Sequence, residues 1–125
     1  PSRFHSKTIE YVCYQNGVFC FYDSDKDLFV YDISRKSKIY IRNIGDMVRK
    51  YGTISGIVPF HEDIMVAFQT NGLIRLRMSQ KYAEEVVNRN IRIFAIYNDP
   101  RQGVLWTRSN YVFKEILHCY QCDAE

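Results

Sequence analysis

Residues 63–77 read DIMVAFQTNGLIRLR, and this stretch decides the fold class. Two apolar runs flank the short polar segment Thr70-Asn71-Gly72. An Asn-Gly pair between two apolar runs is a strong hairpin signal, because both residues tolerate a positive φ angle. The stretch therefore predicts two antiparallel strands that are joined by a tight turn.

Two other stretches share this pattern of strand, polar turn and strand. Residues 17–32 read GVFCFYDSDKDLFVYD, with a predicted turn at 23–27. Residues 103–114 read GVLWTRSNYVFK, with a predicted turn at 108–110. Aligning Val18, Ile64 and Val104 places the three units 46 and 40 residues apart. A period of roughly 40–45 residues is typical of repeated four-stranded units.

Further strand-like runs flank the hairpins. They lie before each hairpin at 8–13, 54–60 and 91–97, and after the first and third hairpins at 37–42 and 115–120. Aromatic residues make up 15% of the chain and hydrophobic residues 46%. Aromatic and β-branched residues fit pleated, half-buried surfaces, so the composition also predicts an all-β fold with a packed core.

Two segments depart from the strand pattern. Residues 45–51 fit a short helical turn, with Asp46 as its cap. Residues 79–87 carry apolar side chains at helical spacing, with Ser79 as a candidate N-cap. Helix and strand therefore both remain open for this second segment.

Charge and apolar patterning exclude several classes of protein. Lys and Arg are scattered and the net charge is +3, so a nucleic-acid-binding arm is not indicated. No apolar run reaches the roughly 18 residues that a membrane span needs. No signal peptide opens the chain.

The hairpins resemble the two-component regulator propeller repeat. Residues 103–107 (GVLWT) match the first half of that repeat, and residues 68–75 (FQTNGLIR) match its second half. Residues 28–32 (LFVYD) match the Leu-x-x-Tyr-Asp close. Only one unit has the Trp of the repeat, at Trp106, and Phe19 and Met65 lie near that position in the other two.

This resemblance implies about three four-stranded antiparallel blades of an incomplete β-propeller over residues 1–125, with repeat units at about 4–44, 45–89 and 90–125. It also implies a non-enzymatic sensing segment of a hybrid two-component receptor. Such a segment is periplasmic, its parent is a histidine kinase, and only the parent contacts the membrane. The implied ligand is an oligosaccharide.

Two other functions stay open. One is a β-propeller scaffold for protein–protein interaction, unrelated to signalling and cytoplasmic. The other, less favoured, is a propeller enzyme whose residues come from separate blades. The chain has no Gly-x-Ser-x-Gly, no phosphate-binding glycine loop and no His-Glu-x-x-His, and its histidines (His5, His61 and His118) lie in different units. The sequence therefore predicts no catalytic residue and no cofactor, and His61 is expected to face solvent.

The candidate ligand-binding residues are Trp106, Arg108 and Tyr111. Trp106 has two interpretations: its flat ring stacks on the face of a sugar, or it packs between neighbouring blades. Packing is the favoured interpretation, because the aromatic residue of this repeat normally has that role.

No metal site is predicted. Asp23, Asp25 and Asp27 alternate as at the start of a calcium loop, but Leu28 and Ser34 occupy the positions that require Gly and Glu. A solvated turn is therefore expected there.

Cysteine spacing also argues against a metal. The four cysteines (Cys13, Cys20, Cys119 and Cys122) do not have the spacing of a structural zinc site. Disulfides and free thiols both remain open, with free thiols favoured, and Cys20 is predicted to lie in the core.

The blade count predicts how the chain assembles. Propellers use roughly 4–8 blades, so three blades cannot close a ring. The first and last blades would then expose apolar faces and strand edges. We therefore expect self-association, with two wedges forming a six-bladed ring, or contact with further blades, unless the fold is not a true propeller.

Overall fold

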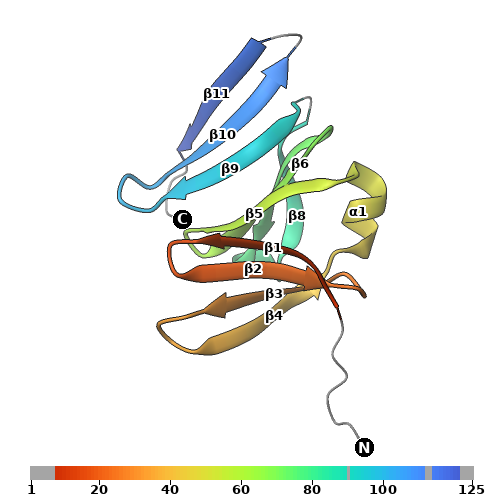
Figure 1. The fold of residues 1–125 in the computed structure, drawn as a ribbon, viewed down its shortest axis with the longest axis vertical. Coiled ribbons are helices and arrows are strands. Elements are labelled where there is room, and N and C mark those ends of the chain that lie inside the picture. Colours follow the sequence, from red (N-terminus) through yellow and green to blue (C-terminus); the bar gives the residue numbers. More distant parts are fainter. Residues whose placement is uncertain (1–7, 90, 112–113, 122–125) are drawn as a thin grey trace, which may run out of the picture.

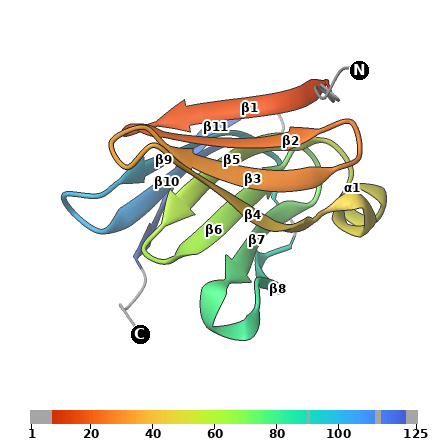
Figure 2. The same cartoon turned by 90° about the horizontal axis from the view of Figure 1, so that it is seen from below.

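The computed structural model describes the backbone of residues 8–89, 91–111 and 114–121, and side chains as far as Ser109. It contains three antiparallel sheets, which follow one another along the long axis of the molecule (Figure 1). Seen from below, along that axis, the strands of the first sheet overlie those of the other two sheets (Figure 2). No helix in the described ranges is long and apolar enough to cross a membrane.

The first two sheets are four-stranded meanders, in which each strand pairs with the next one in the sequence. The strands of the first sheet are β1 (Ile9–Gln15), β2 (Val18–Asp23), β3 (Asp27–Asp32) and β4 (Ser37–Asn43). Those of the middle sheet are β5 (Ile54–Phe60), β6 (Asp63–Phe68), β7 (Gly72–Arg77) and β8 (Ala83–Asn88). The third sheet has, within the described residues, β9 (Ile93–Asp99), β10 (Val104–Tyr111) and β11 (Lys114–Gln121).

The middle sheet is buried on both faces. One face packs on the first sheet through Ile57, Ile64 and Val66, which are at most 4% exposed. The other face packs on the third sheet through Val58 and Met65. Successive side chains of a strand point to opposite faces, so a sheet that is covered twice is apolar at consecutive positions. The DIMVAF run of β6 has that pattern.

The predicted fold class is confirmed. The chain forms an all-β stack of three antiparallel sheets, as an incomplete propeller requires. The predicted strand at 54–60 coincides with β5, and the predicted strand at 37–42 lies within β4. The Asn-Gly hairpin is also present between β6 and β7, although of its two residues only Gly72 has a positive φ angle, of 96°.

The predicted turn at 108–110 is wrong. β10 continues from Val104 to Tyr111 and pairs with β11 along its whole length. Thr107 and Ser109 are only 0% and 2% exposed, so these small polar residues belong to a strand face that packs on the middle sheet. The predicted fourth strand at 115–120 is consequently the third strand, β11.

The predicted alignment of the units is wrong by one residue. The equivalent strands β2, β6 and β10 begin at Val18, Asp63 and Val104, so the units are 45 and 41 residues apart. Because side chains alternate between faces, a shift of one residue moves each side chain to the opposite face. The residue equivalent to Trp106 in the first sheet is therefore Cys20 and not Phe19, whereas Met65 is confirmed for the middle sheet.

The helical turn at 45–51 is confirmed as α1 (Gly45–Tyr51), which connects the first two sheets and buries Met47 and Tyr51. The capping role predicted for Asp46 is wrong. Asp46 lies inside the first turn, and the residue before the helix, Ile44, makes no side-chain cap. The Oδ1 atom of Asn43 instead accepts the N–H of Gly45 at 2.9 Å.

The helix considered for residues 79–87 does not form. A short 3₁₀ turn at Met78–Gln80 is followed by β8, which pairs with β7. Lys81 and Tyr82 have positive φ angles of 55° and 60°, and this left-handed backbone ends the turn. Strand pairing therefore overrides the helical spacing of the apolar residues.

Gln15 connects the first sheet to the third. Its Nε2 donates to the carbonyl of Ile96 at 2.6 Å, and its Oε1 accepts the N–H of Asn98 at 2.9 Å. Both backbone groups belong to β9, on the edge that does not pair with β10. The side-chain amide thus satisfies a sheet edge as a neighbouring strand would.

Replacing Gln15 with Leu is expected to lower the free energy of unfolding by about 1–3 kcal/mol, because two partly buried backbone groups lose their partners. Urea unfolding followed by circular dichroism measures this loss. Gln69→Leu, at an exposed position in the β6–β7 turn, is the matched control and should change stability by less than about 0.5 kcal/mol. An equal effect of the two substitutions would contradict the role of the amide.

Candidate functional site

The face of the first sheet that points away from the middle sheet is rich in aromatic side chains. Strand alternation identifies it, because Cys20 and Leu28 point inward and are 0% exposed, so their neighbours point outward. We call this surface the aromatic face; it consists of Val12, Tyr14, Phe19, Phe21, Phe29, Tyr31, Lys38 and Tyr40.

Rings on the aromatic face contact one another across the strands. The Phe29 ring lies 5.4 Å from that of Phe21 and 5.5 Å from that of Tyr40. The Nζ of Lys38 lies 4.7 Å from the centre of the same ring. Tyr14 and Tyr40 are each 54% exposed. An apolar surface of this kind on a folded chain is typical of a contact with another molecule.

A shallow pocket of about 250 Å³ opens on this face. Its lining is Ile9, Val12, Phe19, Phe21, Tyr31 and Lys38. Specific small-molecule sites combine an apolar lining with several convergent polar groups. Here the lining offers a single charged group, so the pocket suits an apolar side chain better than a polar ligand.

The outer face of the third sheet brings two predicted site residues together. Trp106 pairs with Tyr97, and Arg108 pairs with Ala95, on the side that faces away from the middle sheet. Tyr97 is 51% exposed, Trp106 is half-buried and Arg108 is exposed. The side chain of the third candidate, Tyr111, lies outside the described residues.

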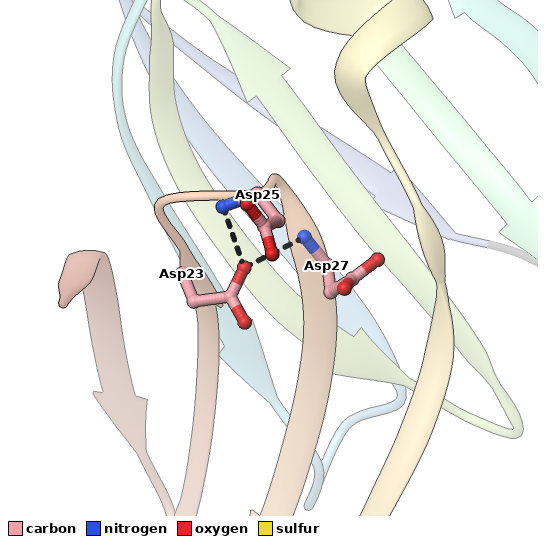
Figure 3. Close-up of side chains that lie close together, drawn as sticks. All are labelled: Asp23, Asp25 and Asp27. Atoms are coloured by element: carbon pink, nitrogen blue, oxygen red, sulfur yellow. Dashed lines mark hydrogen bonds between the residues drawn. The ribbon is translucent and has the colours of Figure 1, made fainter. Parts of the chain in front are cut away.

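The three aspartates of the β2–β3 turn lie close together (Figure 3). One carboxylate oxygen from each of Asp23, Asp25 and Asp27 lies within 4.8 Å of the others. The Oδ1 of Asp23 accepts the N–H groups of Asp25 at 2.9 Å and Asp27 at 3.1 Å, so this carboxylate shapes the turn. Ser24 and Asp25 are exposed, as expected of a solvated turn, whereas Asp23, at the end of β2, is only 7% exposed.

This arrangement differs from a calcium site in its ligand set. Calcium takes roughly six to eight oxygen ligands. Like the carboxylate of Asp23, that of Asp27 is engaged in a hydrogen bond within the protein. Its Oδ1 accepts the side-chain N–H of Asn43 at 2.9 Å. The hydrogen bonds give the aspartates a structural role in closing the hairpin.

His61 is in the turn between β5 and β6, where it is exposed as predicted. Its ring packs on that of Phe60, with 4.4 Å between the ring centres. His5 and the side chain of His118 lie outside the described residues. Within the described residues, His61 therefore has no second histidine beside it.

Two of the four cysteines are described, and both are free thiols. Cys13 and Cys20 pair across β1 and β2, and Cys20 is fully buried, as the sequence predicted. Burial raises the pKa of the Cys20 thiol from 9.0 to about 12, with a smaller contribution from Cys13. The side chain of Cys119 and all of Cys122 lie outside the described residues.

The Cys20 thiol should make stability depend on alkaline pH. The pKa of this thiol is higher in the folded chain than in the unfolded chain. Its contribution to the free energy of unfolding is therefore fully present below about pH 9. The free energy of unfolding should then fall as the pH rises toward 12, by up to about 1.4 kcal/mol per pH unit. Urea unfolding between pH 7 and 10.5 measures this slope.

Cys20→Val removes this titrating group and should reduce the slope, whereas Cys13→Val should retain most of it; the tyrosines whose pKa burial also raises, such as Tyr11 and Tyr22, keep a smaller slope in both variants. Identical pH profiles of wild type and Cys20→Val would show that the Cys20 thiol does not contribute. Both variants conserve the approximate volume of the side chain, so packing losses should remain small at neutral pH.

No protein-family model and no curated protein matches this chain. Two solved structures of the extracellular domain of BT4673 from B. thetaiotaomicron are similar to it in fold. One is described as a one-component system, and it superposes with a TM-score of 0.53 at 17% sequence identity over 97% of this chain. The other is described as a hybrid two-component system, with a TM-score of 0.51 at 17% identity over 91% of this chain.

The similarity is one of fold. It agrees with the resemblance of the hairpin sequences to the two-component regulator propeller repeat. This chain corresponds to 16% and 15% of the length of those two solved chains. Three stacked antiparallel sheets are thus a small part of a much larger extracellular domain in the proteins that share this fold.

Proposed function

We propose that this chain is a non-enzymatic segment of the sensing region of a two-component receptor, located in the periplasm, and that the receptor recognises an oligosaccharide. The observation that supports this proposal is the fold, which the chain shares over nearly its whole length with the extracellular domain of such a system. The parent protein would then carry the histidine kinase and the membrane anchor.

The described residues support a binding role more than a catalytic one. Catalysis requires titratable groups that converge on one position. The described histidine, His61, lies in an exposed turn, and the clustered carboxylates of Asp23 and Asp27 are engaged in hydrogen bonds that shape their own turn. Sheet stacking and open aromatic faces instead provide surfaces for recognition.

A thermal-shift screen against plant and host oligosaccharides tests the proposed ligand class. We expect the melting temperature of the chain to rise with at least one class of glycan, because a ligand that binds only the folded state stabilises it. A simple sugar mixture of the same osmolarity is the control. No shift with any oligosaccharide would count against glycan sensing and would favour the interaction scaffold.

Matched arginine variants then test the candidate site. Arg108→Ala removes a guanidinium from the outer face of the third sheet, whereas Arg35→Ala removes one from the exposed β3–β4 turn. A glycan shift that Arg108→Ala abolishes and Arg35→Ala retains would assign the ligand to the face that carries Trp106. A shift that both variants retain would assign it to another surface.

The gene provides an independent check on the receptor assignment. A coding sequence that continues from this segment into a membrane helix and a histidine kinase would support the proposal. Continuation into an unrelated cytoplasmic domain would overturn it, whatever the result of the glycan screen.

A further inference from the structure

We propose that Cys13 and Cys20 form a disulfide across the β1–β2 hairpin when the folded chain meets a disulfide oxidant. Both side chains are free thiols in this structure, and each lies in a strand of the first sheet. The periplasmic location proposed above would supply the oxidising surroundings in which such bonds form and persist. Only that cellular setting rests on the proposed function, because formation of the bond depends on the geometry of the hairpin.

The strand register places the two cysteines directly opposite each other. Cys13 pairs with Cys20 in the antiparallel ladder of β1 and β2. The Cα atoms of such a pair are about 4.5 or 5.5 Å apart, and both values lie within the range of about 4.4–6.8 Å that disulfides span. Opposed residues also project from the same side of a sheet, so the two sulfur atoms share one face.

Closing the bond requires little movement of the backbone. The Cβ atoms of opposed residues are about 4.5–5.5 Å apart, and disulfides require about 3.5–4.5 Å. β1 lies at the edge of the first sheet, with β2 as its partner. An edge strand has one ladder to maintain, so it can twist toward its partner more easily than a central strand can. Cys13 also contributes to the raised pKa of the Cys20 thiol, which agrees with a short distance between the two thiols.

Burial decides which thiol reacts first. Cys13 is only partly buried, so a dissolved disulfide can reach its sulfur, whereas Cys20 is 0% exposed. The Cys13 thiolate attacks one sulfur of the oxidant, the S–S bond of the oxidant breaks, and one half of the oxidant leaves as a thiolate. Cys13 then carries the other half as a mixed disulfide.

Cys20 completes the exchange from inside the protein. Its thiol loses a proton, and the sulfur attacks the Cys13 sulfur of the mixed disulfide, which expels the second half of the oxidant as a thiolate. The new S–S bond joins Cys13 and Cys20. The two cysteines lose two electrons, which reduce the oxidant to two thiols, and these thiols take up the two protons. Oxidised glutathione is a small disulfide of this kind and serves as the probe.

The bond would hold the strand that carries a contact between sheets. Gln15 lies two residues after Cys13 in β1, and its side chain bonds to the backbone of β9. Fixing β1 on β2 through Cys13 therefore also fixes the position of Gln15, and with it the contact between the first and third sheets.

Equilibration of the purified chain with reduced and oxidised glutathione, followed by alkylation, trypsin digestion and mass spectrometry, tests the proposal. Trypsin releases residues 8–26, which hold Cys13 and Cys20, and residues 115–125, which hold Cys119 and Cys122. The expected product is peptide 8–26 without alkyl groups, lighter than the reduced peptide by two hydrogen atoms. The disulfide-to-dithiol ratio should be at least about tenfold higher in the folded chain than in urea, because a bond that stabilises the fold is itself stabilised by the fold.

Two valine variants test the order of the exchange. Cys20→Val should stop at the mixed disulfide, so its peptide 8–26 should carry one glutathione. Cys13→Val should leave Cys20 as a thiol that neither glutathione nor the alkylating agent modifies while the chain stays folded, because Cys20 is 0% exposed. Circular dichroism verifies that both variants fold, and Cys20→Ala replaces Cys20→Val if the latter does not.

Three results would overturn the proposal. One is a folded wild-type chain in which Cys13 remains a thiol or a mixed disulfide at equilibrium. Another is a bond between peptide 8–26 and peptide 115–125, which would pair Cys13 or Cys20 with a different cysteine. The third is an equal disulfide-to-dithiol ratio in the folded and the urea-unfolded chain. These measurements use the purified chain without glycan, so a failure of the proposed sensing function would be recognised separately.

Discussion

Replacing Arg75 with Met is expected to lower the free energy of unfolding by about 3–5 kcal/mol, because it leaves a buried carboxylate without its counter-ion. The Nε of Arg75 donates to the Oδ2 of Asp63 at 2.6 Å, and their side chains are only 8% and 10% exposed. The other oxygen of Asp63 accepts the N–H of Met78 at 2.8 Å. The ion pair thus connects β6, β7 and the 3₁₀ turn that follows β7.

The same strand offers a matched control. Arg77 forms an ion pair with Glu85 at 3.1 Å, but the Glu85 side chain is 49% exposed. Surface ion pairs contribute about 0–1 kcal/mol, so Arg77→Met should have a small effect. Urea unfolding of both variants measures the difference, and equal losses would show that burial does not govern the strength of the Arg75 pair.

A double variant separates loss of the ion pair from loss of packing. Asp63→Asn combined with Arg75→Met removes both charges and should be more stable than Arg75→Met alone, because the uncompensated carboxylate is gone. The Asn side chain can still accept the Met78 N–H through its oxygen. A double variant that is less stable than the single one would indicate that the hydrocarbon stem of Arg75, and not its charge, stabilises this region.

The sheets were predictable because each strand is defined by local patterning. Two apolar runs and the turn at Asn71-Gly72 fix a hairpin within about fifteen residues, and the pattern recurs along the chain. Helix α1 was also predictable from its own residues. The strands, hairpins and helix that the sequence predicted well therefore depend mainly on contacts between residues that are close together in the chain.

The errors arose where the surroundings of a residue decide its state. Residues 108–110 look like a turn because Ser and Asn favour turns, but Ser109 is buried against the middle sheet and stays in a strand. The spacing of the apolar residues at 79–87 fits a helix, yet β7 presents an open edge that β8 pairs with. Only the neighbouring sheet distinguishes these alternatives.

The candidate site was predicted in part. Trp106 and Arg108 do share one open face, but the aromatic face of the first sheet was missed. Its signal was present, since the VFCFY run of β2 is apolar on both faces, and such runs are typical of sheets that are covered twice. The role of Trp106 also depends on register, because only the corrected alignment places it with Met65 and Cys20 at intersheet positions.

Gly56 is where the spacing between the middle and third sheets can be tested. A Cβ atom on Gly56 would lie 2.0 Å from the Cγ2 of Ile96 in β9, so Gly56→Ala forces the two sheets apart or displaces Ile96. Overpacking of this kind costs about 1–3 kcal/mol or more. Gly17→Ala is the control: Gly17 has a φ angle of +80° and no atom within 4 Å of the added carbon, so its cost is conformational.

Ile96→Ala distinguishes a steric cause from a backbone cause at Gly56. Alone it should cost about 2–5 kcal/mol through lost burial. Combined with Gly56→Ala it should cost clearly less than the sum of the two single changes, because the methyl group that clashes has been removed. With Gly17→Ala the two costs should add to within about 0.5 kcal/mol. Additive costs for the Gly56 pair would mean that contact between β5 and β9 does not set the sheet spacing.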